Sequence, residues 1–355
     1  MAAGGVSGWG TPGLDGTWLP AWLRGAWLMP GVTDLVVHGA GEVWIDRGEG
    51  WERWHPPADA GPVSAGTVRE TAVRLAAWGG RRLDDAMPMA DARMPDGSRL
   101  HAVLEPVAQG GTALSLRAVR MQALTWEDLV TAGTLHPHVA ALIAALVRER
   151  ASLLITGATG AGKTTLLASA LSLVDPRERI VVIEESGEVM PAHPHVVRLV
   201  ERRPNVDGVG AVSLSTLVRE ALRMRPDRMV LGECRGAEVR EVMLALNTGH
   251  RGGLATLHAN SVEDVPARLM GLASLADMSP RAAAMHAGAA FDAVIHVVRE
   301  GGRRRVAQVG VLECGADGEL RVRRALHVDS AGVLHRDQAA DALWRVAGDG
   351  ASAAG

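Results

Sequence analysis

The 355-residue sequence contains no tyrosine, a single phenylalanine and only two cysteines. Cys234 and Cys314 lie far apart and form no C-x-x-C pair. This scarcity speaks against both a disulfide-stabilised scaffold and a tetracysteine zinc site. We therefore expect the two cysteines to be small buried hydrophobic residues.

A long apolar run is also missing. The longest candidate, Val139 to Val147, is bounded by His138 and Arg148 and falls well short of the roughly 18 to 20 residues that cross a bilayer. Glycine, proline and aspartate interrupt the first 30 residues, so no secretory signal is readable there. We expect the protein in the cytoplasm, free or held at the inner face of the cytoplasmic membrane.

The chain has little excess charge. A formal net charge of -3 gives no global basic field that would attract nucleic acid, so the sequence does not support such a partner. One local positive region is interpreted as the solvated faces of a β-hairpin. Its residues are Arg303, Arg304, Arg305, Arg321, Arg323 and Arg324.

Lysine is almost absent, because Lys163 is the only one and the other 36 of the 37 basic residues are arginines. A compact ammonium on a flexible stem can reach between phosphate groups where a planar guanidinium fits poorly. The one position that kept lysine is therefore a candidate phosphate contact.

Lys163 lies in a stretch that satisfies the pattern G-x-x-x-x-G-K-[ST]. The apolar run Ser152 to Thr156 before it predicts a buried strand, and Leu166 to Leu173 after it predicts a helix. In this setting backbone N–H groups and the helix N-terminus bind phosphates, while the Thr164 hydroxyl can ligate Mg²⁺. The predicted nucleotide-binding residues are Gly157, Ala158, Thr159, Gly160, Ala161, Gly162, Lys163, Thr164 and Thr165.

Carboxylates follow two predicted strands downstream. The β-branched run Ile180 to Ile183 ends in Glu184 and Glu185, and one of these could orient the attacking water. A second strand, Met229 to Leu231, leads to Glu233, which occupies the position where a carboxylate would hold Mg²⁺ through water.

A third element combines flexible glycines with histidines. His250 precedes a predicted strand, Leu254 to Leu257, and His258 follows it directly. An imidazole at this place could report on the γ-phosphate. The wide separation of the two histidines, without cysteine partners, speaks against zinc.

The motifs together resemble the type II/type IV secretion ATPase family, and the nearest branch looks like the tight-adherence (Tad) pilus ATPases of actinobacteria. The resemblance rests on the phosphate loop, Ile183-Glu184-Glu185, the stretch Leu222 to Gly236, and Asn247 through Asn260. It extends upstream through Asp91 to Arg99 and Leu114 to Arg117, and so covers about residues 31 to 326.

The resemblance implies an α/β fold, in which a RecA-like P-loop motor domain follows a smaller α+β N-terminal domain. It further implies ATP and Mg²⁺, a homohexameric ring with nucleotide between the two domains, and a platform protein in the inner membrane. Carried over by position, Glu233 matches the Walker B acid and His258 the histidine box. Glu184 and Glu185 match the acidic box, where the family usually has Asp at the second place, so the water-positioning residue stays open between them.

Arginines of the N-terminal domain are further candidates, because arginine charge from another domain or subunit can complete a P-loop site. Arg99 and Arg117 are the expected catalytic residues of this kind, with Arg93 beside them.

The expected organisation has five parts. Residues 1–30 form a Trp/Gly/Pro-rich extension, in which the near-helical spacing of Trp18, Trp22 and Trp27 favours packing over partner binding. Residues 31–122 form the α+β domain and 123–150 a helical linker, split near Gly133 and Pro137. The ATPase domain spans 151–328, and 329–355 is expected to be a mobile tail.

The sequence thus predicts an ATPase motor for pilus assembly or protein secretion. A DNA-transfer ATPase of the conjugation type remains the alternative, since it would share the motor motifs. A small-molecule P-loop kinase would need no N-terminal domain, and a scaffold without activity conflicts with the presence of Lys163, Glu233 and His258.

Overall fold

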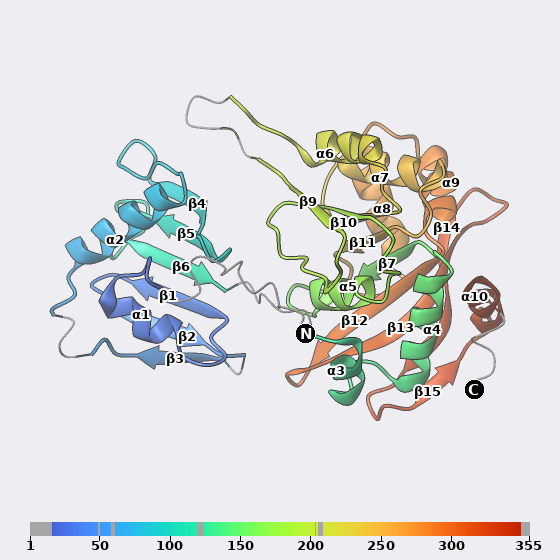
Figure 1. Ribbon diagram of the computed structural model, residues 1–355, viewed down its shortest axis with the longest axis horizontal. Coiled ribbons are helices and arrows are strands. Elements are labelled where there is room, and N and C mark those ends of the chain that lie inside the picture. The colour runs from blue at the N-terminus through green and yellow to red at the C-terminus, as the bar shows by residue number, and fades with distance from the viewer. Residues whose placement is uncertain are drawn as a thin grey trace, which may run out of the picture. The chain divides into compact units, whose positions relative to one another are not determined.

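The computed structural model describes residues 16–48, 50–57, 61–118, 124–202, 204 and 209–348. They divide into two compact units, of which the first holds the described residues up to 118 together with Val209, and the second holds those described within 124–204 and 210–348. Each unit is built around its own β-sheet (Figure 1).

The first unit contains an antiparallel sheet of six strands in the order β3-β2-β1-β6-β5-β4. Buried side chains, such as Leu35 and Val37 of β1, alternate with more exposed ones along every strand except the edge strand β3, so only one face of the sheet carries the core. The strands are β1 (Asp34–His38), β2 (Glu42–Asp46), β3 (Trp51–Trp54), β4 (Met89–Arg93), β5 (Arg99–Val103) and β6 (Ala113–Arg117).

Two helices complete this core, α1 (Ala21–Trp27) and α2 (Ala65–Trp78), and a capping box between Ser64 and Thr67 begins α2. Trp18 and Trp22 are 2% and 5% exposed and belong to the same core. The described part of the expected 1–30 extension is therefore built into the first unit, while Trp9 lies outside the described residues.

The second unit contains a nine-stranded sheet in the order β15-β14-β13-β12-β7-β11-β10-β8-β9. The strands from β12 to β9 in this order run parallel, and the remaining three pair antiparallel. Their bounds are β7 (Leu153–Thr156), β8 (Ile180–Glu184), β9 (Val196–Val200), β10 (Arg228–Cys234), β11 (Leu254–Leu257), β12 (Ala293–Glu300), β13 (Arg303–Cys314), β14 (Leu320–Val328) and β15 (Leu334–Arg336).

Helices cover both faces of this sheet, because its central strands are apolar on both sides. One face packs against α3 (Trp126–Thr131), α4 (Pro137–Arg148), α5 (Lys163–Leu171) and α10 (Ala340–Ala347). The other packs against α6 (Leu214–Ala221), α7 (Glu238–Asn247), α8 (Val265–Ser274) and α9 (Pro280–Ala290), and the short η2 (Leu222–Met224) follows α6. Among the described helices, none is long and apolar enough to cross a membrane.

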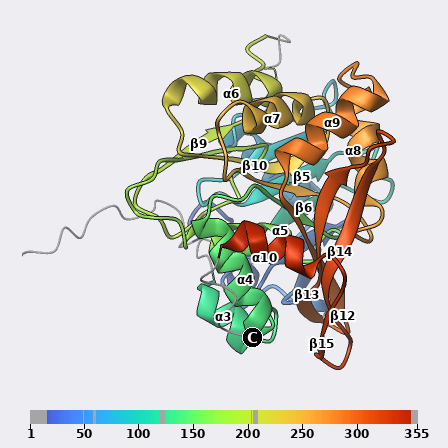
Figure 2. The same cartoon turned by 90° about the vertical axis from the view of Figure 1, so that its right-hand side faces the viewer.

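Residues 349–355 of the expected mobile tail, 329–355, lie outside the described residues, and the described part of this region differs from the expectation. It forms β15 and α10, and α10 packs against α4 and β14 (Figure 2). Leu343 is fully buried there, and the apolar face of α10 is the reason for its order. The expected linker of residues 123–150 likewise supplies α3 and α4 to the core of the second unit.

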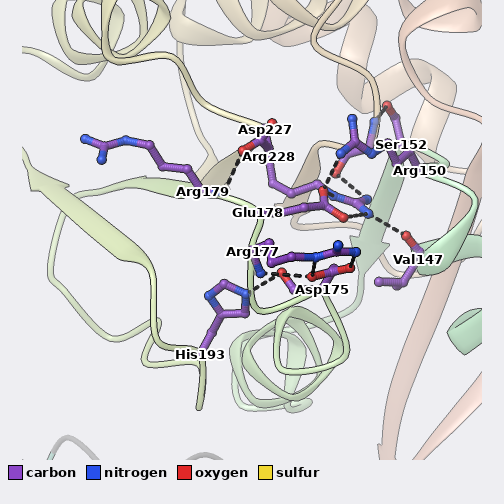
Figure 3. Close-up of polar contacts among 11 residues, drawn as sticks. Val147, Arg150, Ser152, Asp175, Arg177, Glu178, Arg179, His193, Asp227 and Arg228 are labelled. Carbon is purple, nitrogen blue, oxygen red and sulfur yellow. Dashed lines mark hydrogen bonds and ion pairs between the residues drawn. The ribbon is translucent and has the colours of Figure 1, made fainter.

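A buried arginine connects several segments at the end of the sheet where the parallel strands begin. Arg228, at the start of β10, donates to the backbone carbonyls of Val147 and Gly252 and to the carboxylate of Glu178 (Figure 3). These partners precede or end β8, β11 and α4, which are far apart in the sequence. One side chain therefore fixes the relative positions of several elements of the motor unit.

Candidate functional site

The phosphate loop connects β7 to α5 at the opposite edge of the sheet. Gly157 has φ +151, and a Cβ atom there would lie 2.3 Å from the carbonyl oxygen of Val297. Gly162 caps α5 in the left-handed region, with φ +103. Glycine is required at both positions because a side chain would clash at the first and be strained at the second. The predicted helix accordingly begins at Lys163, three residues earlier than expected.

The ammonium of Lys163 folds back onto its own loop. Its Nζ donates to the carbonyl oxygens of Gly157 and Ala158, both at 3.0 Å, and the residue is 7% exposed. Burial lowers the pKa of Lys163, while the nearby Glu233 carboxylate acts in the opposite direction. The loop therefore holds a single cation at its centre, as the sequence pattern predicts for a phosphate contact.

The strand order places the ends of two further strands, β11 and β10, beside this cation. His258 follows β11, and its Nε2 lies 3.5 Å from Nζ of Lys163 and 2.9 Å from Oε1 of Glu233 at the end of β10. The contact between His258 and Glu233 does not have the geometry of a hydrogen bond. Burial, together with the charge of Lys163, lowers the pKa of His258, so the neutral imidazole is favoured.

Sequence reasoning missed Arg235, which continues the chain of contacts. Its Nη2 lies 2.6 Å from Oε2 of Glu233, and its Nη1 donates to Oε2 of Glu185 at 3.0 Å. The only sequence signal was its place two residues after Glu233, on the same side of an extended segment. Lys163, His258, Glu233, Arg235 and Glu185 thus form one continuous polar cluster, which we call the charge chain.

The two residues of the acidic pair have different surroundings. Glu184 is 3% exposed, and its Oε2 accepts the backbone N–H groups of Glu188 and Val189 at 2.6 and 3.1 Å. It shapes the loop after β8. The Glu185 side chain is 30% exposed and reaches Arg235. The geometry therefore associates Glu185, rather than Glu184, with the charge chain.

The arginine-rich hairpin of β13 and β14 is only partly a solvated face. Nε of Arg304 donates to the carbonyl oxygen of Gly160 at 3.2 Å, and a Cβ on Gly162 would lie 3.0 Å from Cδ of Arg304. This part of the hairpin contacts the phosphate loop from outside, whereas Arg321 and Arg323 pair with carboxylates of the hairpin itself.

The N-terminal arginines lie in the first unit and form a row. Arg93 pairs in register with Arg99 across β4 and β5, and Arg99 pairs with Arg117 across β5 and β6. Asp34 follows on β1, where its Oδ1 lies 3.9 Å from Nε of Arg117. Like charges directly opposite one another destabilise a sheet, and the Asp34 carboxylate offsets part of this repulsion at Arg117.

Other site residues have simpler surroundings. Thr164 and Thr165 lie in the first turn of α5 and are half-buried. His250 lies in the loop before β11, away from the charge chain, so the two predicted histidines have different surroundings. Cys234 is buried, as expected, and burial raises the pKa of its thiol above the usual range. Cys314 is only partly buried.

Comparisons with known proteins identify the family of the chain and similar folds. The profile of the type II/IV secretion system protein family matches residues 25–317. A Mycobacterium tuberculosis H37Rv protein, whose name assigns it to conjugal transfer, is 46% identical over 306 residues, which cover 84% of this chain and 86% of the relative. The type IV secretion system protein PtlH of Bordetella pertussis is 30% identical over 261 residues, covering 67% and 76%.

Two solved structures are similar in fold. The pilus retraction motor PilT with bound ADP aligns with a TM-score of 0.55 and 20% identity, over 81% of each chain. The Legionella pneumophila ATPase DotB aligns with a TM-score of 0.51 and 18% identity, over 84% of this chain and 78% of DotB. The expected RecA-like P-loop fold with a preceding α+β domain is confirmed. The chain therefore belongs to the type II/IV secretion system protein family and is an ATPase of that family.

Proposed function

We propose that this ATPase is a homohexameric motor that hydrolyses ATP at the charge chain and drives pilus assembly or protein secretion through a membrane platform protein. The observation that carries the proposal is the continuous contact from Lys163 to Glu185, which joins the phosphate loop to two carboxylates and a neutral imidazole. ATP binding and hydrolysis need a cation for the phosphates and a base or carboxylate for the water.

The site residues divide this work. Lys163 would exchange the carbonyls of Gly157 and Ala158 for phosphate oxygens of ATP, since an ammonium binds anions more strongly than neutral carbonyls. Glu185 would orient the attacking water, and His258 would report on the γ-phosphate. The Thr164 hydroxyl would hold Mg²⁺ directly and the Glu233 carboxylate through water, since oxygen donors of this kind suit Mg²⁺. When bound, Mg²⁺ would neutralise phosphate charge as a Lewis acid.

The arginine row of the first unit would contribute positive charge to the transferred phosphate, from the same or a neighbouring subunit. Its support is the register of Arg93, Arg99 and Arg117 on adjacent strands. Arg117→Ala should lower turnover far more than nucleotide binding, because such charge acts mainly in the transition state. Equal losses of both would contradict this role.

The test of the motor is phosphate release from ATP over a range of protein concentrations, with Lys163→Ala as the blank. Specific activity that rises steeply with concentration, together with a hexamer by light scattering, would support a ring. Unchanged hydrolysis by Lys163→Ala would show that the site is wrong. We place the motor on the cytoplasmic face of the inner membrane, and co-sedimentation with vesicles carrying the platform protein checks this.

The alternative is a DNA-transfer ATPase, which the conjugal-transfer name of the Mycobacterium tuberculosis relative favours. Stimulation of hydrolysis by single-stranded DNA would support this alternative. If the protein instead belongs to a branch close to the Tad pilus motors, its ATP hydrolysis should be stimulated by the platform protein and not by DNA.

A further inference from the structure

Arg235 lies between the two carboxylates of the charge chain and contacts both of them. Its guanidinium contacts Glu233, at the end of β10, through Nη2 at 2.6 Å, and Glu185, just after β8, through Nη1 at 3.0 Å. The Glu233 and Glu185 side chains are 20% and 30% exposed and the Arg235 side chain is 50% exposed, so the contacts are shielded from water mainly on the carboxylate side. A planar fork with separate N–H donors can hold two anions at once, which an ammonium does poorly.

The backbone of Arg235 is itself held in place. Oε1 of Glu238, the first residue of α7, accepts the N–H groups of Arg235 at 2.6 Å and Gly236 at 2.8 Å. Glu238 is 6% exposed, so this anchor is buried. The arginine is therefore aimed at the two carboxylates from a fixed backbone.

Without Arg235, the two strand ends would present two neighbouring carboxylates and no shared cation. Like charges repel, and each side chain would turn toward solvent. Glu184 has other surroundings than Glu185, because its Oε2 accepts two backbone N–H groups in the loop after β8.

We propose that Arg235 is a positioning residue of the ATPase reaction, which holds Glu185 and Glu233 in one arrangement beside Lys163 and His258. The inference deepens the proposed function and rests on hydrolysis at this site. Arg235 acts through the carboxylates: Glu233 keeps its orientation toward His258, and Glu185 keeps its place for the water. Its loss therefore affects turnover and leaves nucleotide binding nearly intact.

The test is a double-mutant cycle on the full chain with Arg235→Gln, Glu185→Gln and the double variant. For each, kcat and KM for ATP are measured together with the Kd of a fluorescent ADP analogue. We expect Arg235→Gln to lower kcat about 10- to 100-fold, as for loss of a residue that orients a functional ligand, with Kd changed less than about threefold. The double variant should be no slower than the slower single variant, because the two residues act as one unit.

Arg240 is an exposed arginine on α7, and Arg240→Gln is the matched control. This variant should have the same kcat as the unmodified protein. Multiplicative losses in the double variant, or an Arg235→Gln enzyme with unchanged kcat, would overturn the proposal. Equal losses of kcat and ADP affinity would also overturn it. If Arg235→Gln does not fold, Arg235→Lys takes its place in the same cycle. Unchanged hydrolysis by Lys163→Ala would reject the proposed site as a whole. This outcome differs from failure of the Arg235 proposal alone.

Discussion

Nδ1 of His296, on β12, lies 2.9 Å from Oγ1 of Thr156, the residue that directly precedes the phosphate loop. His296 is 3% exposed, and burial lowers its pKa below the usual 6.5, although a hydrogen bond to the backbone of Asn260 acts in the opposite direction. A neutral imidazole thus supports the strand from which the loop departs.

This pairing predicts a dependence of stability on pH. Well above pH 6.5 both the folded and the unfolded states carry neutral His296. As pH falls below that value, the unfolded chain binds the proton first, so stability decreases until the pH has passed the lowered pKa. His296→Gln should flatten this part of the curve, measured by urea unfolding at several pH values. The exposed His138→Gln serves as control, and an unchanged slope in His296→Gln would contradict the prediction.

Because Glu184 and Glu185 have different surroundings, we expect their substitutions to have different effects. Glu184→Ala should destabilise the protein by about 2 kcal/mol, because two backbone N–H groups lose a charged acceptor. Glu185→Ala should leave the unfolding midpoint unchanged and lower kcat at least about tenfold. Urea unfolding and phosphate release on both variants test this, and the reverse pattern would assign the site role to Glu184.

The buried pair at the far edge of the sheet predicts a large loss of stability. Arg228 is 1% exposed and its Nε lies 2.7 Å from Oε2 of Glu178. Glu178→Gln leaves a buried cation without its anion, and we expect a loss of about 3 kcal/mol in urea unfolding. Glu220→Gln removes the anion of an exposed pair with Arg223 and should not shift the midpoint. Equal effects of the two variants would show that burial of Arg228 does not matter.

Arg228 also leaves no room for a side chain at position 252, which is a glycine. Its φ is +82, and a Cβ atom would lie 2.4 Å from Nη1 of Arg228. Gly252→Ala should therefore lower the free energy of unfolding by more than Gly249→Ala, which has φ +102 but open space around it. The strained backbone alone accounts for about 1 kcal/mol or more in each, and the difference measures the clash. Similar losses in both variants would mean that Arg228 moves aside freely.

Much of the site was predictable from the sequence because its signals are local. The G-x-x-x-x-G-K-T pattern fixes the glycines and Lys163 within one loop, and apolar runs identified the strands that end near Glu184, Glu233 and His258. Acids after parallel strands meet at one edge of a sheet, so their proximity was expected as well.

The contacts between these elements were not predictable, because they depend on strand order. His258 reaches Lys163 across 95 residues, since β11 pairs directly with β7. Arg235 joins Glu185 to Glu233 because β10 lies beside β8. No local pattern marks an arginine for such a role in a chain with 36 arginines.

The sequence by itself determined the phosphate loop and the α/β fold, since these depend on spacing and periodicity along the chain, and the resemblance of its motifs indicated the family. Only the tertiary structure decided that Glu184 supports a loop while Glu185 joins the charge chain, and that residues 334–347 pack onto the motor unit. The physical reason is that Glu184 and Glu185 are the same residue type side by side in the sequence but differ in burial. Burial is set by contacts between segments that are distant in the sequence.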